Sequence, residues 1–89
     1  MFTMTSKYLP AKENRGARVR AYTTGNVHVS ATKPYNPGRD DYENHAAAAL
    51  ECMTEFVTRQ FGHEFLVREV HSGQTRNGDW VWLFNVGVK

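Results

Sequence analysis

Cysteine is nearly absent from this 89-residue chain, and that absence limits the kinds of site it can build. Cys52 is the single cysteine, so no internal disulfide and no cysteine-rich zinc site can form. No apolar run approaches the roughly 20 residues that a membrane-spanning helix requires. The amino-terminal stretch also lacks the apolar core of a signal peptide. We therefore expect a cytosolic protein that has no membrane partner.

The sequence also lacks the motifs that usually mark an enzyme. It contains no glycine-rich loop between a strand and a helix, where a phosphate would be held. His45 and Cys52 would lie two helical turns apart, about 10 Å along the axis, which is too far for direct pairing. His63 and His71 lie on either side of a predicted strand. Neither the His45–Cys52 spacing nor the His63–His71 spacing is that of a metal site. We predict no catalytic residue, metal ligand, cofactor or small-molecule substrate, and we expect Cys52 to be a small buried hydrophobic residue.

The sequence does contain one strong helical pattern, over residues 40–61. Its apolar residues recur at the spacing of one helical face, and those expected to pack on a sheet are Leu50, Met53 and Phe56. Asp40, or less favourably Asn36, can cap the start of this helix, and Gly62 is placed to end it. A helix with one apolar face does not fold alone, so strands must cover that face.

A first β-hairpin is predicted before the helix. Residues 17–22 and 27–32 alternate small apolar and polar side chains on either side of a turn at residues 23–26. Residues 1–16 are expected to form an irregular segment, although residues 5–9 could form a short edge strand.

A second hairpin is predicted after the helix, from residues 64–70 and 80–88. The last strand is apolar on both faces: Trp80, Trp82, Phe84 and Val86 point one way, and Val81 and Leu83 the other. Such a strand is usually central in its sheet or covered on both sides.

These elements predict a single α+β domain over residues 1–89. We expect an antiparallel sheet of about four strands, in the order β-β-α-β-β, with one helix packed on one face. One helix covers one face only, yet strand 80–88 offers large apolar groups to both. The second face should therefore be covered by the amino-terminal segment or by a partner.

Charge is distributed unevenly along the chain. Residues 1–39 carry seven basic residues against one acidic residue, whereas residues 40–89 carry four against eight. One interpretation is a basic face for an anionic partner. The other is that basic strands and an acidic helix neutralise each other within one fold.

Six aromatic and basic residues are predicted to share the sheet face away from the helix: Arg18, Arg20, Tyr22, Trp80, Trp82 and Phe84. Such a face is a stacking platform for single-stranded nucleic acid. The alternative is that the tryptophans lie in the core and that Val81 and Leu83 face outward. Nearby basic residues could contact phosphates or guard a strand against edge pairing: Lys7, Lys12 and Arg15.

Three stretches together resemble a group of small proteins encoded by tailed bacteriophages and prophages: KYLPAKENRGARVRA, ENHAAAAL and NGDWVWLF. The resemblance spans most of the chain, although Lys12-Glu13 and Trp80 depart from the usual pattern. It implies a phage origin, and therefore the cytoplasm of an infected host. It implies no activity and transfers no catalytic residue.

We expect an accessory protein that acts by binding, not by catalysis. The first hypothesis is a host protein partner, including inhibition of a host defence or metabolic enzyme in the manner of anti-CRISPR proteins. Self-association into a homodimer is also open. The alternative is a nucleic-acid-binding module that uses a basic and aromatic sheet face. Salt dependence separates these hypotheses, because phosphate contacts weaken steeply with salt and apolar contacts do not.

Overall fold

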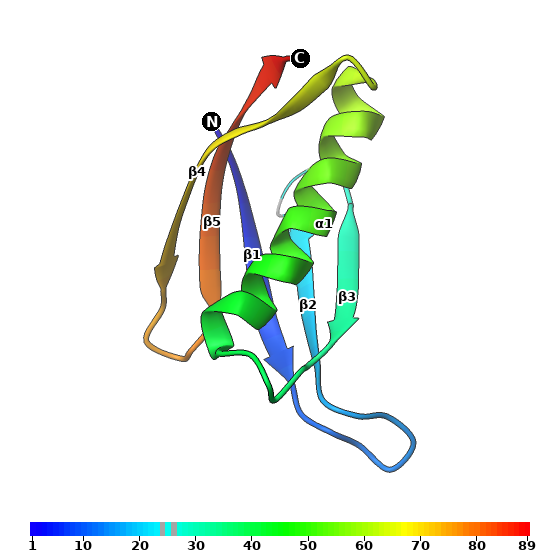
Figure 1. Cartoon of the computed structure of the whole chain (residues 1–89), viewed down its shortest axis with the longest axis vertical. Helices are drawn as coiled ribbons and strands as arrows, with labels where there is room; N and C mark the ends of the chain where they lie inside the picture. The colour runs from blue at the N-terminus through cyan, green and yellow to red at the C-terminus, as the bar shows by residue number, and fades with distance from the viewer. Residues whose placement is uncertain (24, 26) are drawn as a thin grey trace.

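A computed structural model describes residues 1–23, 25 and 27–89. Its elements are, in chain order, β1 (Phe2–Leu9), β2 (Arg18–Thr23), β3 (Ser30–Pro34), α1 (Asp41–Phe61), β4 (Phe65–Gln74) and β5 (Trp80–Val88). The strands form one antiparallel five-stranded sheet in the order β3-β2-β1-β5-β4, and α1 lies across one face of it (Figure 1). The α+β class and the antiparallel sheet with a helix are confirmed.

The expectation of an irregular amino-terminal segment and of about four strands is wrong, because β1 is the middle strand of the sheet. It pairs with β2 on one side, where Lys7 lies opposite Arg20, and with β5 on the other, where Met4 lies opposite Trp82. Burial alternates along the segment FTMTSKYL, where Met4 and Ser6 are the buried residues. Because Ser6 is polar, the sequence shows only a weak apolar alternation. Its strand structure comes from neighbours that are distant in sequence.

Helix α1 begins and ends where the sequence predicts. The Asp40 carboxylate accepts a hydrogen bond from the Glu43 backbone N–H at 2.7 Å, and the Glu43 side chain completes a capping box. Gly62 follows the last turn with a φ of 99°, a backbone conformation that favours glycine.

The face that α1 buries is rotated from the predicted one. Met53 and Phe56 are buried as expected, but Leu50 is 48 % exposed, so its assignment to the core is wrong. The buried residues are Asn44, His45, Ala48, Ala49, Cys52, Met53, Phe56 and Val57. Small alanines allow α1 to approach the sheet closely, and the two polar residues can be buried because strand and loop groups hydrogen-bond to them.

Both predicted hairpins are present. In the first, Ala21 lies opposite Ala31, and Val19, Ala21 and Val29 are buried. Residues 24 and 26 of its predicted turn lie outside the described residues. In the second, β4 runs on through residues 71–74, and β5 lies between β1 and β4, which confirms its interior position.

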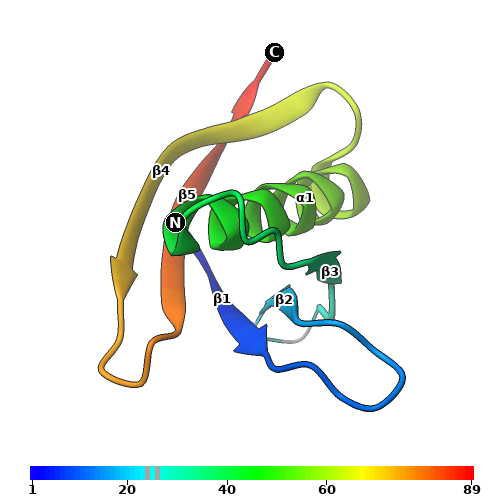
Figure 2. The ribbon, with the colours of Figure 1, turned by 60° about the horizontal axis from the view of Figure 1, so that its bottom comes forward.

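A β-bulge bends strand β4. The register with β5 shifts between Arg68 and His71, and Glu69 within the shift has a φ of 52°. Bulges add a local bend and twist to a strand. Figure 2 shows β4 curving over the carboxyl-terminal end of α1, so the sheet wraps around the helix.

The core lies between α1 and the sheet face that it covers. It draws on β1, β2, β5 and the start of β3, with Trp82, Phe84, Met4 and Met53 as its largest fully buried apolar side chains. No helix in the described part of the chain is long and apolar enough to cross a membrane.

Candidate binding face

The sheet register separates the six predicted site residues into two groups. Thr5 lies opposite both Tyr22 on β2 and Val81 on β5, so these three side chains share one face. Met4 lies opposite Trp82 and is fully buried beneath α1, so Trp82 belongs to the other face. The strand period of two then places the predicted aromatic set of β5 against the helix: Trp80, Trp82 and Phe84.

The prediction of one shared face is therefore wrong for these three aromatic residues. Trp82 is 1 % exposed and Phe84 is fully buried, whereas Val81 and Leu83 point away from α1. The structure has the alternative arrangement, with the tryptophans in or beside the core. The physical reason is bulk: α1 buries the small residues Ala48, Ala49 and Cys52, and large aromatic groups of β5 fill the space between α1 and the sheet.

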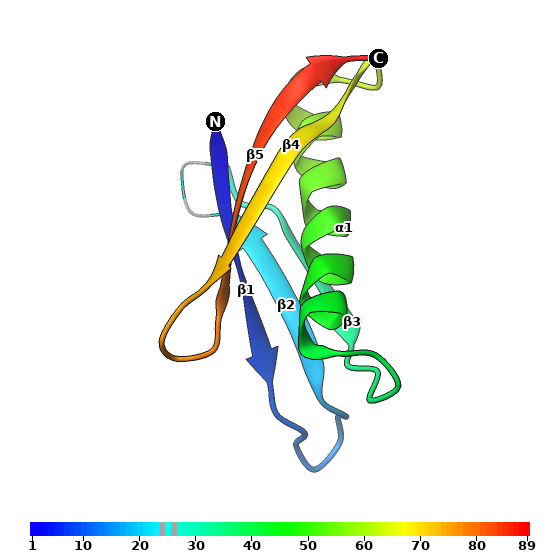
Figure 3. The same ribbon diagram turned by 60° about the vertical axis from the view of Figure 1, so that its left-hand side comes forward.

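The remaining predicted residues, Arg18, Arg20 and Tyr22, stay together on the side of the sheet away from α1. We call this side the open face; its β1 and β2 residues include Thr5, Lys7, Arg18, Arg20 and Tyr22. Figure 3 views the sheet nearly edge-on and shows α1 lying along one side of it. The amino-terminal segment does not cover the open face, because it forms β1 instead.

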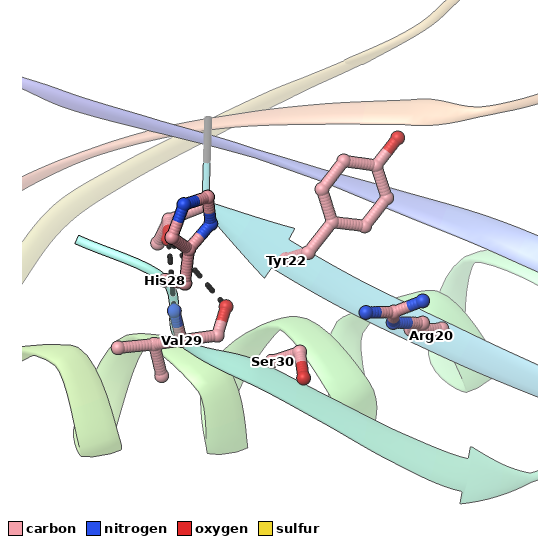
Figure 4. A pocket seen from close by; sticks show the side chains of 6 residues that line it. Arg20, Tyr22, His28, Val29 and Ser30 are labelled. Carbon is pink, nitrogen blue, oxygen red and sulfur yellow. Dashed lines mark hydrogen bonds between the residues drawn. The ribbon is translucent and has the colours of Figure 1, made fainter. Parts of the chain in front are cut away.

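Two hollows lie side by side on the open face, along β2 and β3. The smaller, of about 200 Å³, is lined by Arg20, Tyr22, Thr23, His28, Val29 and Ser30 (Figure 4). The larger, of about 500 Å³, is lined by Leu9, Arg15, Arg18, Arg20, Ser30 and Thr32. Arg20 and Ser30 line both hollows, so the two adjoin, and we call the pair the groove; neither lining includes an acidic residue.

The arginines of this groove have no carboxylate partner in residues 1–23, 25 and 27–89. The ion pairs found there join Lys7 to Asp79, Lys33 to Glu51, His45 to Asp41 and Arg59 to Glu55. Neutralisation within the fold therefore applies to the two lysines but not to Arg15, Arg18 or Arg20. Arg18 Nη1 is enclosed by protein and has no hydrogen-bond partner among the described residues. Arg15 and Arg20 are exposed, so their charge is accessible to an external anion.

Tyr22 stands beside Arg20 in the groove. The Arg20 guanidinium carbon lies 5.8 Å from the centre of the Tyr22 ring, within cation–π distance. Tyr22 is half-buried, and its ring rises from β2 next to the hollow (Figure 4). A flat aromatic group with an adjacent guanidinium can stack on an unpaired base.

A second polar cluster lies on the covered side, and sequence reasoning missed it. His45 Nδ1 lies 2.7 Å from Ser6 Oγ, and Trp82 Nε1 donates a hydrogen bond to the same oxygen at 2.9 Å. Because Ser6 accepts from Trp82, its hydroxyl can donate to His45, which leaves the proton of a neutral imidazole on Nε2. That atom lies 3.6 Å from Asp41 Oδ1.

Serine, histidine and aspartate in contact are the components of a nucleophilic triad, but here Ser6 is fully buried. A substrate cannot approach its Oγ, so the cluster serves to tie α1 to β1 and β5. Burial lowers the pKa of the His45 imidazole, and the nearby Asp41 carboxylate offsets part of that shift. The spacing of Asp41 and His45 on one helical face was visible in the sequence, but the Ser6 strand was not.

Cys52 is fully buried, which confirms its expected place in the core. Burial, followed by the charges of Glu55 and Glu51, raises the pKa of the Cys52 thiol to about 11. The thiolate that a nucleophile requires is therefore scarce at neutral pH. In the part of the chain that the structure describes, no three histidine, cysteine or acidic residues come close enough to hold a metal ion.

Of the six residues predicted for the site, the structure thus brings together three on an uncovered face and places three against the helix. It adds His28, Ser30 and Arg15 to the first set. No protein-family model, no curated protein and no solved structure matches this chain. The geometry of the open face is therefore the basis on which a function can be argued.

Proposed function

We propose that this protein binds single-stranded nucleic acid on the open face. The observation that carries the proposal is the group of arginines without carboxylate partners beside a half-buried tyrosine on a sheet face that no helix covers. Positive charge supplies most of the affinity for a phosphate backbone, and aromatic side chains stack on unpaired bases. A phage origin, which the sequence resemblance implies, belongs to the same proposal.

The spacing of the arginines supports this function. Arg18 and Arg20 occupy alternate positions of β2, so their side chains leave the sheet on the same face about 7 Å apart. That separation is close to the distance between consecutive phosphates of an extended single strand. Arg15, in the segment between β1 and β2, lines the same groove and extends the row of positive charge.

The location of the aromatic residues also bears on the choice between partners. A host protein partner was expected to cover surplus apolar area contributed by Trp80, Trp82 and Phe84. Because these side chains pack against α1, strand β5 leaves only Val81 and Leu83 as apolar groups on the open face. The open face is thus better suited to a polyanion than to an apolar protein surface.

A host protein partner remains a second candidate because apolar residues are exposed elsewhere. On the outer side of α1, Leu50 is 48 % exposed and lines a hollow together with Ala47. A partner or a second copy of this chain that docked there would leave the open face free. This candidate predicts an interaction that changing Arg18 and Arg20 does not affect.

The decisive experiment measures oligonucleotide binding as a function of salt. Binding of a labelled single strand should weaken linearly on a log–log plot, with a slope of about −0.7 for each phosphate neutralised. Replacing Arg18 and Arg20 with glutamate should weaken binding and make the slope shallower by about 1.4, the contribution of two phosphate contacts. Circular dichroism and urea unfolding should show that the variant remains folded.

A matched control carries the same change of charge on the helix side of the molecule. The double variant Lys33→Glu and Arg59→Glu alters two residues that pair with helix carboxylates at the surface. Such exposed pairs contribute little to stability, so the control should fold and should keep most of the affinity and the salt slope. Equal losses in both double variants, or no salt-dependent binding by the wild type, would contradict the proposal.

A pull-down from bacterial lysate, with and without nuclease, tests the second candidate. Under the proposal, nuclease should remove most of what the wild type captures. A captured protein that survives nuclease and also binds the Arg18→Glu/Arg20→Glu variant would favour a protein partner. The variant Leu50→Ser would then show whether the outer side of α1 is its docking surface.

A further inference from the structure

We infer that the smaller hollow on the open face is a subsite for one unpaired nucleobase and that the larger hollow holds the adjoining phosphates. The ligand would then be a single strand that lies along β2 and β3 and occupies about four nucleotides. This inference rests on the proposed function, and it adds where the base goes, where the backbone goes and how long the site is.

The smaller hollow is lined by the side-chain types that stack on bases. Tyr22, His28 and Arg20 each carry a flat π-system, and all three surround the same space of about 200 Å³ (Figure 4). Unpaired bases stack on aromatic rings, on histidine and on guanidinium planes. A hollow of this size suits one base but not a base pair. In a duplex, moreover, the faces of each base are already covered by the neighbouring base pairs. The lining thus selects a single strand.

The wall of the smaller hollow is held in place by hydrogen bonds. The Thr23 backbone N–H donates to the Val29 carbonyl at 3.0 Å, and the Val29 backbone N–H donates to Thr23 Oγ1 at 3.1 Å. Thr23 Oγ1 in turn donates to the Val27 carbonyl at 2.6 Å. These bonds fix the segment that carries His28 and Ser30, so little order must be acquired when a ligand binds.

The larger hollow has the composition of a phosphate site. Arg15, Arg18 and Arg20 contribute guanidinium groups, and Ser30 and Thr32 contribute hydroxyls. These are the side chains that contact phosphate and sugar oxygens most often. Arg15 and Arg20 are exposed, so their guanidinium groups are accessible to phosphate oxygens.

The length of the groove sets the size of the site. Arg18 and Tyr22 are four residues apart on one strand, which separates their side chains by about 13 Å. That distance spans about two nucleotide steps, and Arg15 adds about one more beyond the end of β2. A ligand that contacts the whole groove therefore has about four nucleotides.

The first test uses tetranucleotides in which one base at a time is replaced by an abasic sugar, leaving the phosphates unchanged. Wild-type protein should lose affinity when one particular base is removed, by between about 5-fold and 150-fold, the range for one stacked base. Tyr22→Ala should bind the intact tetranucleotide with a similar loss and should show no further loss with that abasic ligand. Tyr22→Phe should behave like the wild type, because stacking does not need the hydroxyl.

Two further variants protect this test against a failure to fold. His28→Ala removes an exposed ring from the opposite wall of the hollow, and it should also weaken binding of the intact ligand more than of the abasic one. Tyr8→Ala removes a tyrosine that is 46 % exposed on β1 and packs against Tyr35 away from the groove, and it should leave affinity unchanged.

The second test is a length series of oligothymidylates and oligouridylates from two to eight nucleotides. Affinity for each should rise steeply up to about four nucleotides and then level off. The two series separate DNA from RNA as the source of the strand. A rise that continues steeply to eight nucleotides would overturn the four-nucleotide site.

The outcomes distinguish this inference from the function on which it rests. Equal affinity for intact and abasic tetranucleotides, with salt-dependent binding that Arg18→Glu/Arg20→Glu abolishes, would overturn the base subsite and leave nucleic-acid binding in place. Absence of binding to every oligonucleotide would overturn both.

Discussion

The two faces of one sheet differ completely in what their residues do, although the same strands build both. On β5, Trp82 is 1 % exposed against α1, and the next residue, Leu83, is 37 % exposed on the opposite side. On β2, Val19 is buried beneath α1, whereas Arg18 and Arg20 line the groove of the open face. Because side chains alternate along a strand, the covered face can provide stability while the open face is free to bind a ligand.

The comparison also shows that polarity alone does not separate the faces. The covered face contains Ser6, Asn44 and His45, which are buried with hydrogen-bond partners from other elements. Among the described residues, each side has one enclosed atom without a hydrogen-bond partner: His45 Nε2 on the covered side, 3.6 Å from Asp41 Oδ1, and Arg18 Nη1 on the open face. What distinguishes the open face is therefore its uncompensated arginine charge, since its arginines have no carboxylate partner among the described residues.

The largest contrast between the faces should appear at adjacent residues of β5. Phe84→Ala should reduce the free energy of unfolding by about 3–5 kcal/mol, because it leaves a cavity in the core. Leu83→Ala, one residue away on the open face, should cost less than about 1 kcal/mol. Urea unfolding of the two variants measures both values, and similar losses would mean that the faces are not as different as the structure implies.

A second contrast is expected between the inner and outer sides of α1. Met53 is fully buried, so Met53→Ala should cost about 2–5 kcal/mol. Leu50→Ala should change stability by no more than about 0.5 kcal/mol, because the Leu50 side chain is half exposed. A large loss of unfolding free energy for Leu50→Ala in the isolated monomer would mean that α1 packs on the sheet through the face that the sequence predicts.

Breaking the buried polar cluster should have a smaller effect. Ser6→Ala removes the partner of both Trp82 Nε1 and His45 Nδ1, and we expect a loss of about 1–3 kcal/mol. Thr3→Ala, an exposed hydroxyl on the open face of the same strand, is the matched control and should cost less than about 1 kcal/mol. A Ser6→Ala variant as stable as this control would show that the cluster does not hold α1 to β1.

The pH dependence of stability should report the same cluster. Because burial lowers the pKa of His45, the unfolded chain takes up a proton more readily than the folded one. Stability should therefore be complete above the ordinary histidine pKa of about 6.5 and should fall as the pH decreases below it. Urea unfolding between about pH 7.5 and pH 5.5 measures this loss. A His45→Gln variant should have a flatter curve, and a flat curve for the wild type would argue against a neutral buried His45.

The smallest effect on stability is expected on the open face. Arg18→Gln and Arg20→Gln each remove a charge that has no carboxylate partner, so each should change the free energy of unfolding by no more than about 0.5 kcal/mol. The same variants should weaken oligonucleotide binding. A stability loss comparable to that of Ser6→Ala would mean that these arginines are structural and would weaken the case for a binding face.

Much of the local structure followed from residue pattern alone. The helix signals were all local: the cap at Asp40, the glycine at position 62 and apolar residues at helical spacing between them. Both hairpins were also recognisable, since each combines a turn with two alternating segments. Cys52 could be assigned to the core because a lone cysteine without a nearby base behaves as a small apolar residue.

The candidate site was only partly predictable. Arg18, Arg20 and Tyr22 share a face by strand period alone, so their grouping could be read from the sequence. Whether Trp82 joined them could not, because β5 carries apolar side chains on both faces and its pattern does not say which face meets the helix. His28 and Ser30 joined the groove through the pairing of β2 with β3.

The sequence by itself thus determined where the helix and the two hairpins lie, because caps, turns and apolar periods act over a few neighbouring residues. Only the tertiary structure decided that β1 is the middle strand, that α1 buries Asn44 and His45 while exposing Leu50, and that the tryptophans belong to the core. These outcomes depend on contacts between residues far apart in the chain, such as the hydrogen bonds that join Ser6 to His45 and Trp82. A polar residue is stable in a core only when a distant partner satisfies it, and no local pattern reveals that partner.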